Sequence, residues 1–341
     1  MNRRSLLTTI AIGGACMTAS DPKAAVPDEQ GTTVTVSGVE IVCRFTLPQG
    51  IPRAALLLLP GSLYSDVDGN YPSMNMRPHA YADLARQLGL RGFAVLRMAK
   101  IGPGTGSRTL DPDAALRHVD FLTRVEVAEA GLALLRRTVP ARPIIVAGHS
   151  EGAVVTSLLA AGPAAEQVDG VVSLSGPALP LLSMMRAQVA AMAPQGVTPD
   201  MTVFDSAAAA IRAGVSPSDE ARSNPQTAML ASMPEPGRAY LRTADQIDPV
   251  AALAQARQPV LIVQGGRDDS VPSSNADILR LGRGDLPTEV AVFPNLTHFY
   301  KVAPAGLSPI QSMALDTESD PAVAEAIARW ASSLSPPGLS G

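Results

Sequence analysis

The chain has 341 residues, of which 46% are hydrophobic and 17% charged, so it is long enough to bury one sizeable core plus an insertion. Its formal net charge of −4 excludes the basic surface typical of nucleic-acid-binding proteins. Aromatic residues make up only 4%, which argues against a platform for stacking bases or extended sugars. Two cysteines and four scattered histidines do not supply a zinc site, and we expect neither a metal nor another cofactor.

The N-terminus has the pattern of an export signal. Arg3 and Arg4 precede Ser-Leu-Leu and a short apolar stretch, and small residues that suit cleavage follow. We predict a twin-arginine-like signal peptide over residues 1–20 and a polar linker over 21–30, and hence a periplasmic or extracellular protein. The apolar stretch is too short for a stable membrane span. Cys16 makes a lipoprotein a minor alternative.

The predicted strands and helices then alternate along the chain. Residues 32–36 and 40–45 predict a strand pair, and Cys43 in the second strand is expected to be buried and unpaired. Unbroken apolar runs are typical of strands buried on both faces, and spacings of three and four residues predict helices. The order that follows is strand 54–59, helix 81–90, strand 93–98 and helix 118–138.

The next apolar strand, from residue 143, runs into Gly148-His-Ser-Glu-Gly152, and a helix-compatible segment over 151–159 follows. A G-x-S-x-G turn between a strand and a helix holds the serine hydroxyl on a sharp, strained bend. Side chains in place of either glycine would collide across that bend. The free N–H groups of the helix favour an oxyanion beside the serine. We therefore predict that Ser150 is a nucleophile; the alternative is a simple helix N-cap.

After a strand at 170–174, the strand signal disappears between residues 178 and 246. We predict that this insertion is a helical cap over the active site, while residues 31–177 and 247–335 form the core. Six of the chain's twelve methionines lie in it. A methionine-rich lid can adapt to varied apolar acyl groups, but packing within the cap's own core accounts for the same spacing, and we favour that interpretation. The methionines are Met184, Met185, Met192, Met201, Met229 and Met233.

An acid and a base follow the last two predicted strands. Strand 259–264 leads to Asp268 and Asp269, and strand 288–293 leads to His298, 30 residues after Asp268. Carboxyl ends of parallel strands lie at one edge of a sheet, so these groups can converge on Ser150. We favour Asp268 because it opens an Asp-x-x-Val-Pro turn, and we interpret Asp269 as a solvated or capping residue.

The other histidines are weaker candidates for the base. His79 precedes a helix and suggests a cap or surface group, and His118 lies on a predicted helix and is expected to be solvated. His149 adjoins Ser150 inside the elbow and cannot easily face the hydroxyl. Only His298 occupies a loop after a strand late in the chain. A helix over 320–334 closes the predicted doubly wound, mostly parallel α/β sheet.

These motifs resemble the α/β-hydrolase superfamily over residues 30–335, and within it bacterial esterases and serine-aminopeptidase-like hydrolases. A further likeness lies at residues 57–70, which are similar to the GSGPxDRDGN loop of a bacterial esterase subgroup. The resemblance implies that the backbone N–H groups of Ser62 and Glu151 form an oxyanion hole, with Leu63 as the alternative to Ser62. The side chains of these donors are not expected to matter.

We expect an exported serine hydrolase that cleaves small carboxylic esters through a Ser150, His298 and Asp268 acyl-enzyme mechanism. The alternatives are an aminopeptidase or other peptidase, a thioesterase or a lactonase with the same three residues. An aminopeptidase would need an acid for the substrate amine, and Asp66, Asp68 or a residue of the cap are candidates. A non-catalytic binding protein is the remaining alternative. Acyl-chain preference and oligomeric state are not predicted.

Overall fold

The computed structural model describes residues 26–141, 143–193 and 196–334. The predicted export signal over residues 1–20, Cys16 and most of the linker lie outside the described residues. Within the described ranges, no helix combines the length and apolar character needed to cross a bilayer.

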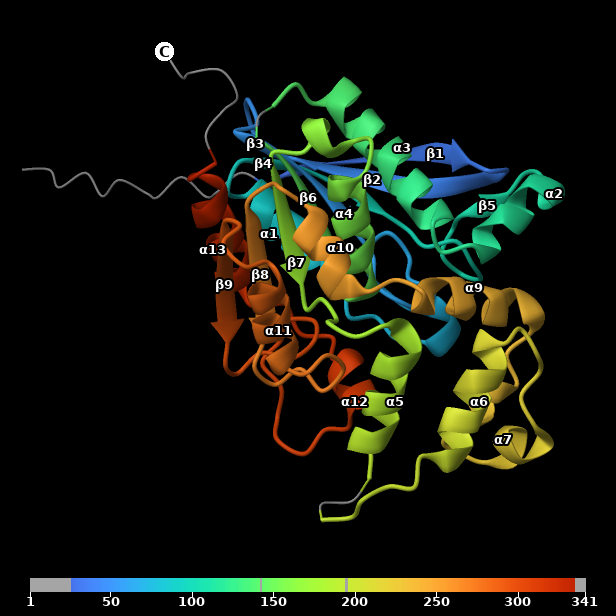
Figure 1. The fold of residues 1–341 in the computed structure, drawn as a ribbon. Helices are drawn as coiled ribbons and strands as arrows, with labels where there is room; N and C mark the ends of the chain where they lie inside the picture. Colours follow the sequence, from blue (N-terminus) through green and yellow to red (C-terminus); the bar gives the residue numbers. More distant parts are fainter. Residues whose placement is uncertain (1–25, 142, 194–195, 335–341) are drawn as a thin grey trace, which may run out of the picture.

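A nine-stranded, mostly parallel sheet forms the centre of the fold, which confirms the predicted fold class (Figure 1). Its order is β1-β2-β4-β3-β6-β7-β8-β9, and β5 pairs with β2. Strands β3, β4 and β6 to β9 pair in parallel, whereas β1, β2 and β5 pair antiparallel. The bounds are β1 Asp28–Val36, β2 Val39–Leu47, β3 Ala54–Leu59, β4 Phe93–Met98, β5 Arg108–Thr109, β6 Ile144–His149, β7 Gly170–Leu174, β8 Val260–Gly265 and β9 Thr288–Phe293.

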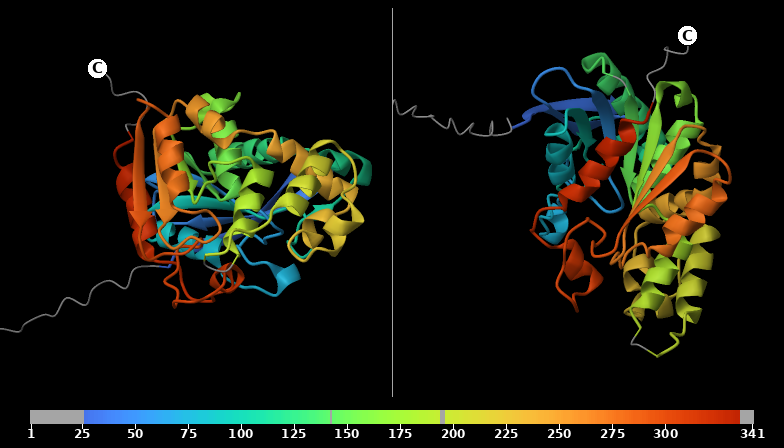
Figure 2. Two further views of the ribbon diagram at one scale, coloured as in Figure 1. Left: turned by 60° about the horizontal axis from the view of Figure 1, so that its bottom comes forward. Right: turned by 90° about the vertical axis from the view of Figure 1, so that its left-hand side faces the viewer.

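Helices cover both faces of the sheet, and for this reason the central strands are apolar on both sides. Figure 2 shows α1 and α13 on one face and α3, α4, α10 and α11 on the other. The bounds are α1 Ala80–Gly89, α2 Pro112–Ala115, α3 Thr123–Thr138, α4 Glu151–Ala161, α10 Pro249–Gln255, α11 Ser274–Gly282, α12 Pro309–Met313 and α13 Pro321–Ala331.

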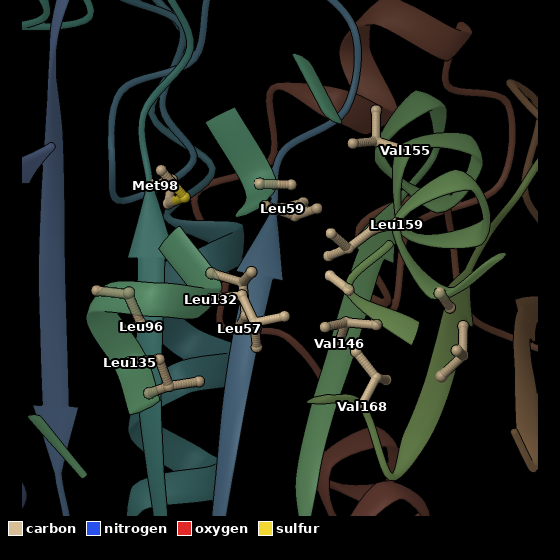
Figure 3. Close-up of a cluster of buried hydrophobic side chains, with 14 of the residues drawn as sticks. Leu57, Leu59, Leu96, Met98, Leu132, Leu135, Val146, Val155, Leu159 and Val168 are labelled. Carbon is tan, nitrogen blue, oxygen red and sulfur yellow. The ribbon is translucent and has the colours of Figure 1, made fainter. Parts of the chain in front are cut away.

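Two clusters of buried side chains fill the spaces between the sheet and its helix layers. In one, Leu57 and Leu96 from the strands meet Leu132 on α3 and Leu159 on α4 (Figure 3). The other packs residues of α1 and α13, including Trp330, on the opposite face. The sheet is thereby held rigidly, so its carboxyl edge can position a site.

The described residues between β7 and β8 form α5 to α10, and α5 to α9 lie on the side of the sheet toward which the arrowhead of β9 points (Figure 1). We call α5 to α9 the helical insertion; it has a hydrophobic cluster of its own. Of its methionines, Met184 and Met201 are buried, whereas Met192 and Met229 are largely exposed. The bounds are α5 Leu181–Ala191, α6 Thr202–Arg212, α7 Asp219–Ser223, α8 Ala228–Ala231 and α9 Glu235–Asp245.

The predicted helix over 118–138 is wrong at its N-terminal end. The chain forms α2 and a 3-10 turn up to Val119, and α3 starts only at Thr123. Phe121 is buried between these elements, and its backbone N–H donates to the Thr243 hydroxyl at 2.9 Å. Its apolar character reflects tertiary packing against the helical insertion, not a helical stripe. His118 is half-buried and its Nε2 contacts the Val36 carbonyl at 3.1 Å, so it is not a freely solvated group.

Candidate active site

Ser150 lies at the sharp turn between β6 and α4. Its backbone has φ 55° and ψ −123°, a conformation that costs a non-glycine residue about 1–3 kcal/mol. A Cβ at Gly148 would lie 2.0 Å from the Gly152 carbonyl oxygen, and one at Gly152 would lie 2.7 Å from the Leu59 carbonyl oxygen. Both glycines are therefore required by backbone contacts. The strained turn presents the half-buried Ser150 at the N-terminus of α4.

Asp268 and His298 meet at the carboxyl edge of the sheet, after β8 and β9. The distance from His298 Nδ1 to Asp268 Oδ2 is 2.8 Å, and both side chains are buried. Because the carboxylate can only accept, Nδ1 carries the hydrogen and the Nε2 lone pair of His298 is free to take a proton.

The loop after β8 orients the Asp268 carboxylate. Oδ1 accepts from the backbone N–H groups of Ser270 and Val271 at 2.9 and 2.8 Å. Oδ2 also accepts from the buried Gln264 amide at 3.2 Å, a partner that sequence reasoning missed. Burial raises the pKa of Asp268, but the neighbouring imidazole and these donors outweigh it and hold that pKa below its usual value. The adjacent Asp269 is exposed and has no such position.

His149 connects the elbow to the His298 loop. Its Nε2 lies 2.9 Å from the His298 carbonyl oxygen, and the two imidazole rings are 4.4 Å apart. Since that carbonyl only accepts, Nε2 carries the hydrogen and Nδ1 accepts from the buried Tyr81 hydroxyl at 3.3 Å. Burial lowers the pKa of His149 to about 3, so the ring is neutral near pH 7. His149, which directly precedes Ser150, therefore joins the elbow to the His298 backbone.

The loop after β3 lies against the elbow. A Cβ at Gly61 would be 3.1 Å from the Ser150 Cβ atom. The Gly61 N–H already donates to the Tyr81 hydroxyl at 2.8 Å, which leaves Ser62 as the next backbone donor along the loop. Leu63, the alternative donor, has φ 65° and an exposed side chain.

The Glu151 side chain lies at the centre of a polar cluster that sequence reasoning missed. Its Oε1 accepts from Lys100 Nζ at 2.9 Å, Arg124 Nη1 at 2.6 Å and the Tyr240 hydroxyl at 2.7 Å. Its Oε2 accepts from the Ser62 hydroxyl at 3.0 Å. We call these five residues the Glu151 cluster. Lys100 lies two residues after the end of β4, so the rule that selected Asp268 and His298, a polar residue in the loop after a strand, also selects Lys100.

Asp66 and Asp68 are occupied by structural contacts. Asp66 Oδ1 accepts from the backbone N–H groups of Asp68 and Asn70 at 2.9 and 2.8 Å. Asp68 forms ion pairs with Arg97 at 2.8 Å and with Arg44 at 3.0 Å. Both carboxylates are therefore already engaged by groups of the protein. Among the described residues, no group of histidine, cysteine, aspartate and glutamate side chains has the arrangement of a metal site.

The mostly parallel sheet and the residues gathered at its carboxyl edge define a member of the α/β-hydrolase superfamily. The family model described as serine aminopeptidase, S33 (Hydrolase_4) matches residues 74–300, and the chain belongs to this family of hydrolases. No curated protein matches the sequence.

Solved structures share the fold at low sequence identity. Est1E from Butyrivibrio proteoclasticus has a TM-score of 0.53 at 15% identity, over 88% of this chain and 96% of its own. A Pyrococcus furiosus esterase has a TM-score of 0.53 at 15% identity, over 86% and 91%. The Pyrococcus horikoshii acylaminoacyl peptidase has a TM-score of 0.54 at 14% identity, over 94% of this chain and 43% of its own.

Proposed function

We propose that the protein is a serine hydrolase that cleaves carboxylic esters of small molecules. The observation that carries this proposal is the buried His298–Asp268 pair, held beside the Ser150 elbow by the His149 contact. The orientation of the pair leaves His298 Nε2 as a base, and the strained turn presents a hydroxyl at a helix N-terminus. Membership of a hydrolase family and a fold shared with two esterases support the same conclusion.

In the proposed reaction, the Ser150 hydroxyl oxygen attacks the acyl carbon as His298 Nε2 takes its proton. Asp268 stabilises the resulting imidazolium, and the N–H groups of Ser62 and Glu151 donate to the oxyanion. His298 then protonates the departing alcohol. Water, activated by the same imidazole, hydrolyses the acyl-enzyme and restores the free serine.

Cleavage of aminoacyl amides is the competing proposal, because the family description names a serine aminopeptidase. An aminopeptidase binds a positively charged substrate amine, whereas the Glu151 cluster contains two cations and one carboxylate. Asp66 and Asp68 are bound to other groups. The charge beside the nucleophile therefore favours a neutral or anionic substrate over an ammonium group.

A substrate panel tests the proposal. Purified protein is assayed with p-nitrophenyl esters of increasing acyl length, with a thioester and a lactone, and with aminoacyl p-nitroanilides, with Ser150→Ala as the inactive control. We expect ester turnover that Ser150→Ala abolishes, with anilide turnover at least about 100-fold slower. Faster anilide turnover would favour the peptidase, and activity that survives in Ser150→Ala would exclude the serine mechanism.

We further propose that the helical insertion caps this site and that residues 1–20 direct export. The Tyr240–Glu151 contact supports the first proposal, and Arg3-Arg4 ahead of an apolar stretch supports the second. Replacing both arginines by lysine should retain the protein in the cytoplasm of an expression host with an active twin-arginine system. Unchanged export of that variant would contradict the assignment.

A further inference from the structure

The strongest unused feature of the molecule is the buried Glu151 carboxylate. Glu151 is only 7% exposed, and four donors from four separate segments converge on its two oxygens. The proposed mechanism uses the backbone N–H of this residue and gives its side chain no role. Removing a carboxylate and its two cationic partners from water costs free energy. A role in positioning neighbouring groups is a reason for the fold to keep such a cluster.

Two of these contacts reach the proposed oxyanion hole. The Ser62 hydroxyl donates to Glu151 Oε2, so the side chains of the two proposed backbone donors are joined directly. Arg124 bonds Glu151 Oε1 through Nη1 and the Pro60 carbonyl oxygen through Nη2 at 3.3 Å. Pro60 is two residues before Ser62, so the loop is held at two points.

We propose that the Glu151 carboxylate is a positioning residue that sets the separation of the Ser62 and Glu151 N–H groups. This inference rests on the proposed function, because it assigns the side chain a task in the same oxyanion hole. An oxyanion hole is effective only when both donors lie within about 3.1 Å of the developing charge, so a small displacement of the loop lowers turnover.

The charges of the cluster make the carboxylate difficult to replace. Lys100 and Arg124 share one Glu151 oxygen, and each of these three side chains is at most 14% exposed. Without the carboxylate, two buried cations would repel each other and move apart. Because Arg124 holds Pro60, such a movement would displace the loop that carries Ser62. The hydroxyl of Tyr240 stays neutral in this setting, since burial raises its pKa well above the usual value.

The test compares Glu151→Gln and Ser62→Ala with wild type on a p-nitrophenyl ester. Both variants keep the backbone N–H groups. Glu151→Gln removes the negative charge and turns one accepting oxygen into an N–H donor, and Ser62→Ala removes the hydroxyl that donates to Glu151 Oε2. We expect kcat to fall about 10- to 100-fold for Glu151→Gln and about 3- to 10-fold for Ser62→Ala, with KM within about threefold. The affinity for a trifluoromethyl ketone, which forms a tetrahedral adduct with serine, should fall by the same factors as kcat/KM.

Three controls separate positioning from general damage. Glu126→Gln makes the same change in the exposed Arg117–Glu126 ion pair and should leave kcat unchanged. Ser62→Thr restores a hydroxyl and should recover most of the turnover lost in Ser62→Ala. In the double variant, Ser62→Ala should add less than twofold to the loss in Glu151→Gln, because both changes alter the same Ser62–Glu151 contact.

Unchanged kcat in both single variants, with wild type active, would overturn the inference and leave the proposed function intact. Wild type that hydrolyses no ester would instead contradict the proposed function. If Glu151→Gln does not fold, Ser62→Ala and Ser62→Thr decide the question, since they alter one half-buried hydroxyl: equal kcat in the two variants would overturn the inference.

Discussion

The His149 imidazole donates through Nε2 to the His298 carbonyl oxygen at 2.9 Å, which joins the elbow of Ser150 to the loop of the proposed base. The same ring accepts from Tyr81, whose hydroxyl in turn accepts the Gly61 N–H. One neutral side chain thereby connects the loops after β3, β6 and β9. The relative positions of the proposed nucleophile, the proposed base and the proposed oxyanion loop thus depend on a residue that has no part in the proposed chemistry.

Acid should weaken this connection. The folded-state pKa of His149 is about 3, below the value of about 6.5 in the unfolded chain, so the unfolded state binds more protons between these limits. Stability is therefore lost as the pH falls through this window. Between pH 7 and pH 5 wild type should lose about 2 kcal/mol of unfolding free energy through this group.

Urea unfolding of wild type and His149→Gln at both pH values measures this contribution. The variant lacks the titrating ring, so its loss should be smaller by about that 2 kcal/mol. Equal losses in the two proteins would show that His149 is not buried as a neutral ring. Asp268 does not interfere, because its depressed pKa affects stability only at lower pH, below about 4.

The Asp268 carboxylate should be required for turnover, and Asp269 should not. Asp268→Asn places an amide against His298 Nδ1, which favours the wrong tautomer, and kcat should fall about 10³- to 10⁴-fold. Asp269→Asn changes an exposed neighbour in the same way and should alter kcat less than about twofold. Steady-state kinetics on a p-nitrophenyl ester distinguish them; a larger loss in Asp269→Asn would reverse the assignment.

Tyr240 should couple the helical insertion to turnover. Tyr240→Phe removes the hydroxyl that donates to Glu151 Oε1, and we expect an approximately fivefold lower kcat with about 1 kcal/mol of lost stability. Tyr64→Phe is the matched control, because that side chain is 48% exposed. If the two variants have equal kcat values, the insertion contact has no part in positioning the site.

The elbow should not tolerate a side chain at Gly148. In Gly148→Ala the added Cβ would meet backbone atoms of Gly152 and Ala153 at 2.0 to 2.6 Å, and the melting temperature should fall by roughly 5–10 °C. Gly31→Ala, where nothing lies within 4 Å, should change it by less than about 2 °C. Differential scanning fluorimetry of both variants gives the comparison, and an unchanged Gly148→Ala would contradict the tight crossing.

Local patterns in the sequence predicted much of this site. Four residue ranges are apolar throughout or alternate between apolar and polar residues, and the strand bounds that they predict agree with the structure. They are residues 54–59, 93–98, 170–174 and 288–293. Parallel pairing then carries the residues after those strands to one edge. That geometric rule brings Asp268 and His298 together without any contact being visible in the sequence.

The rest depended on tertiary packing. The Glu151 cluster joins residues of two loops, two helices and the insertion that are up to 178 positions apart, and no spacing pattern encodes such a meeting. The predicted helix starts at residue 118, too early, because Phe121 is apolar at a spacing that fits a helix. Phe121 is apolar because it is buried against the insertion. In both cases the helical insertion supplies one of the contacts, through Tyr240 in the cluster and through Thr243 beside Phe121.

Labelling with a fluorophosphonate probe tests the central claim most directly. Such a probe phosphonylates a serine hydroxyl only when a neighbouring base activates it. Intact-mass and peptide mass spectrometry of native protein should show one adduct on Ser150, abolished by Ser150→Ala and strongly slowed in His298→Gln. Native protein that remains unlabelled at Ser150, or labels equally fast in His298→Gln, would contradict the account.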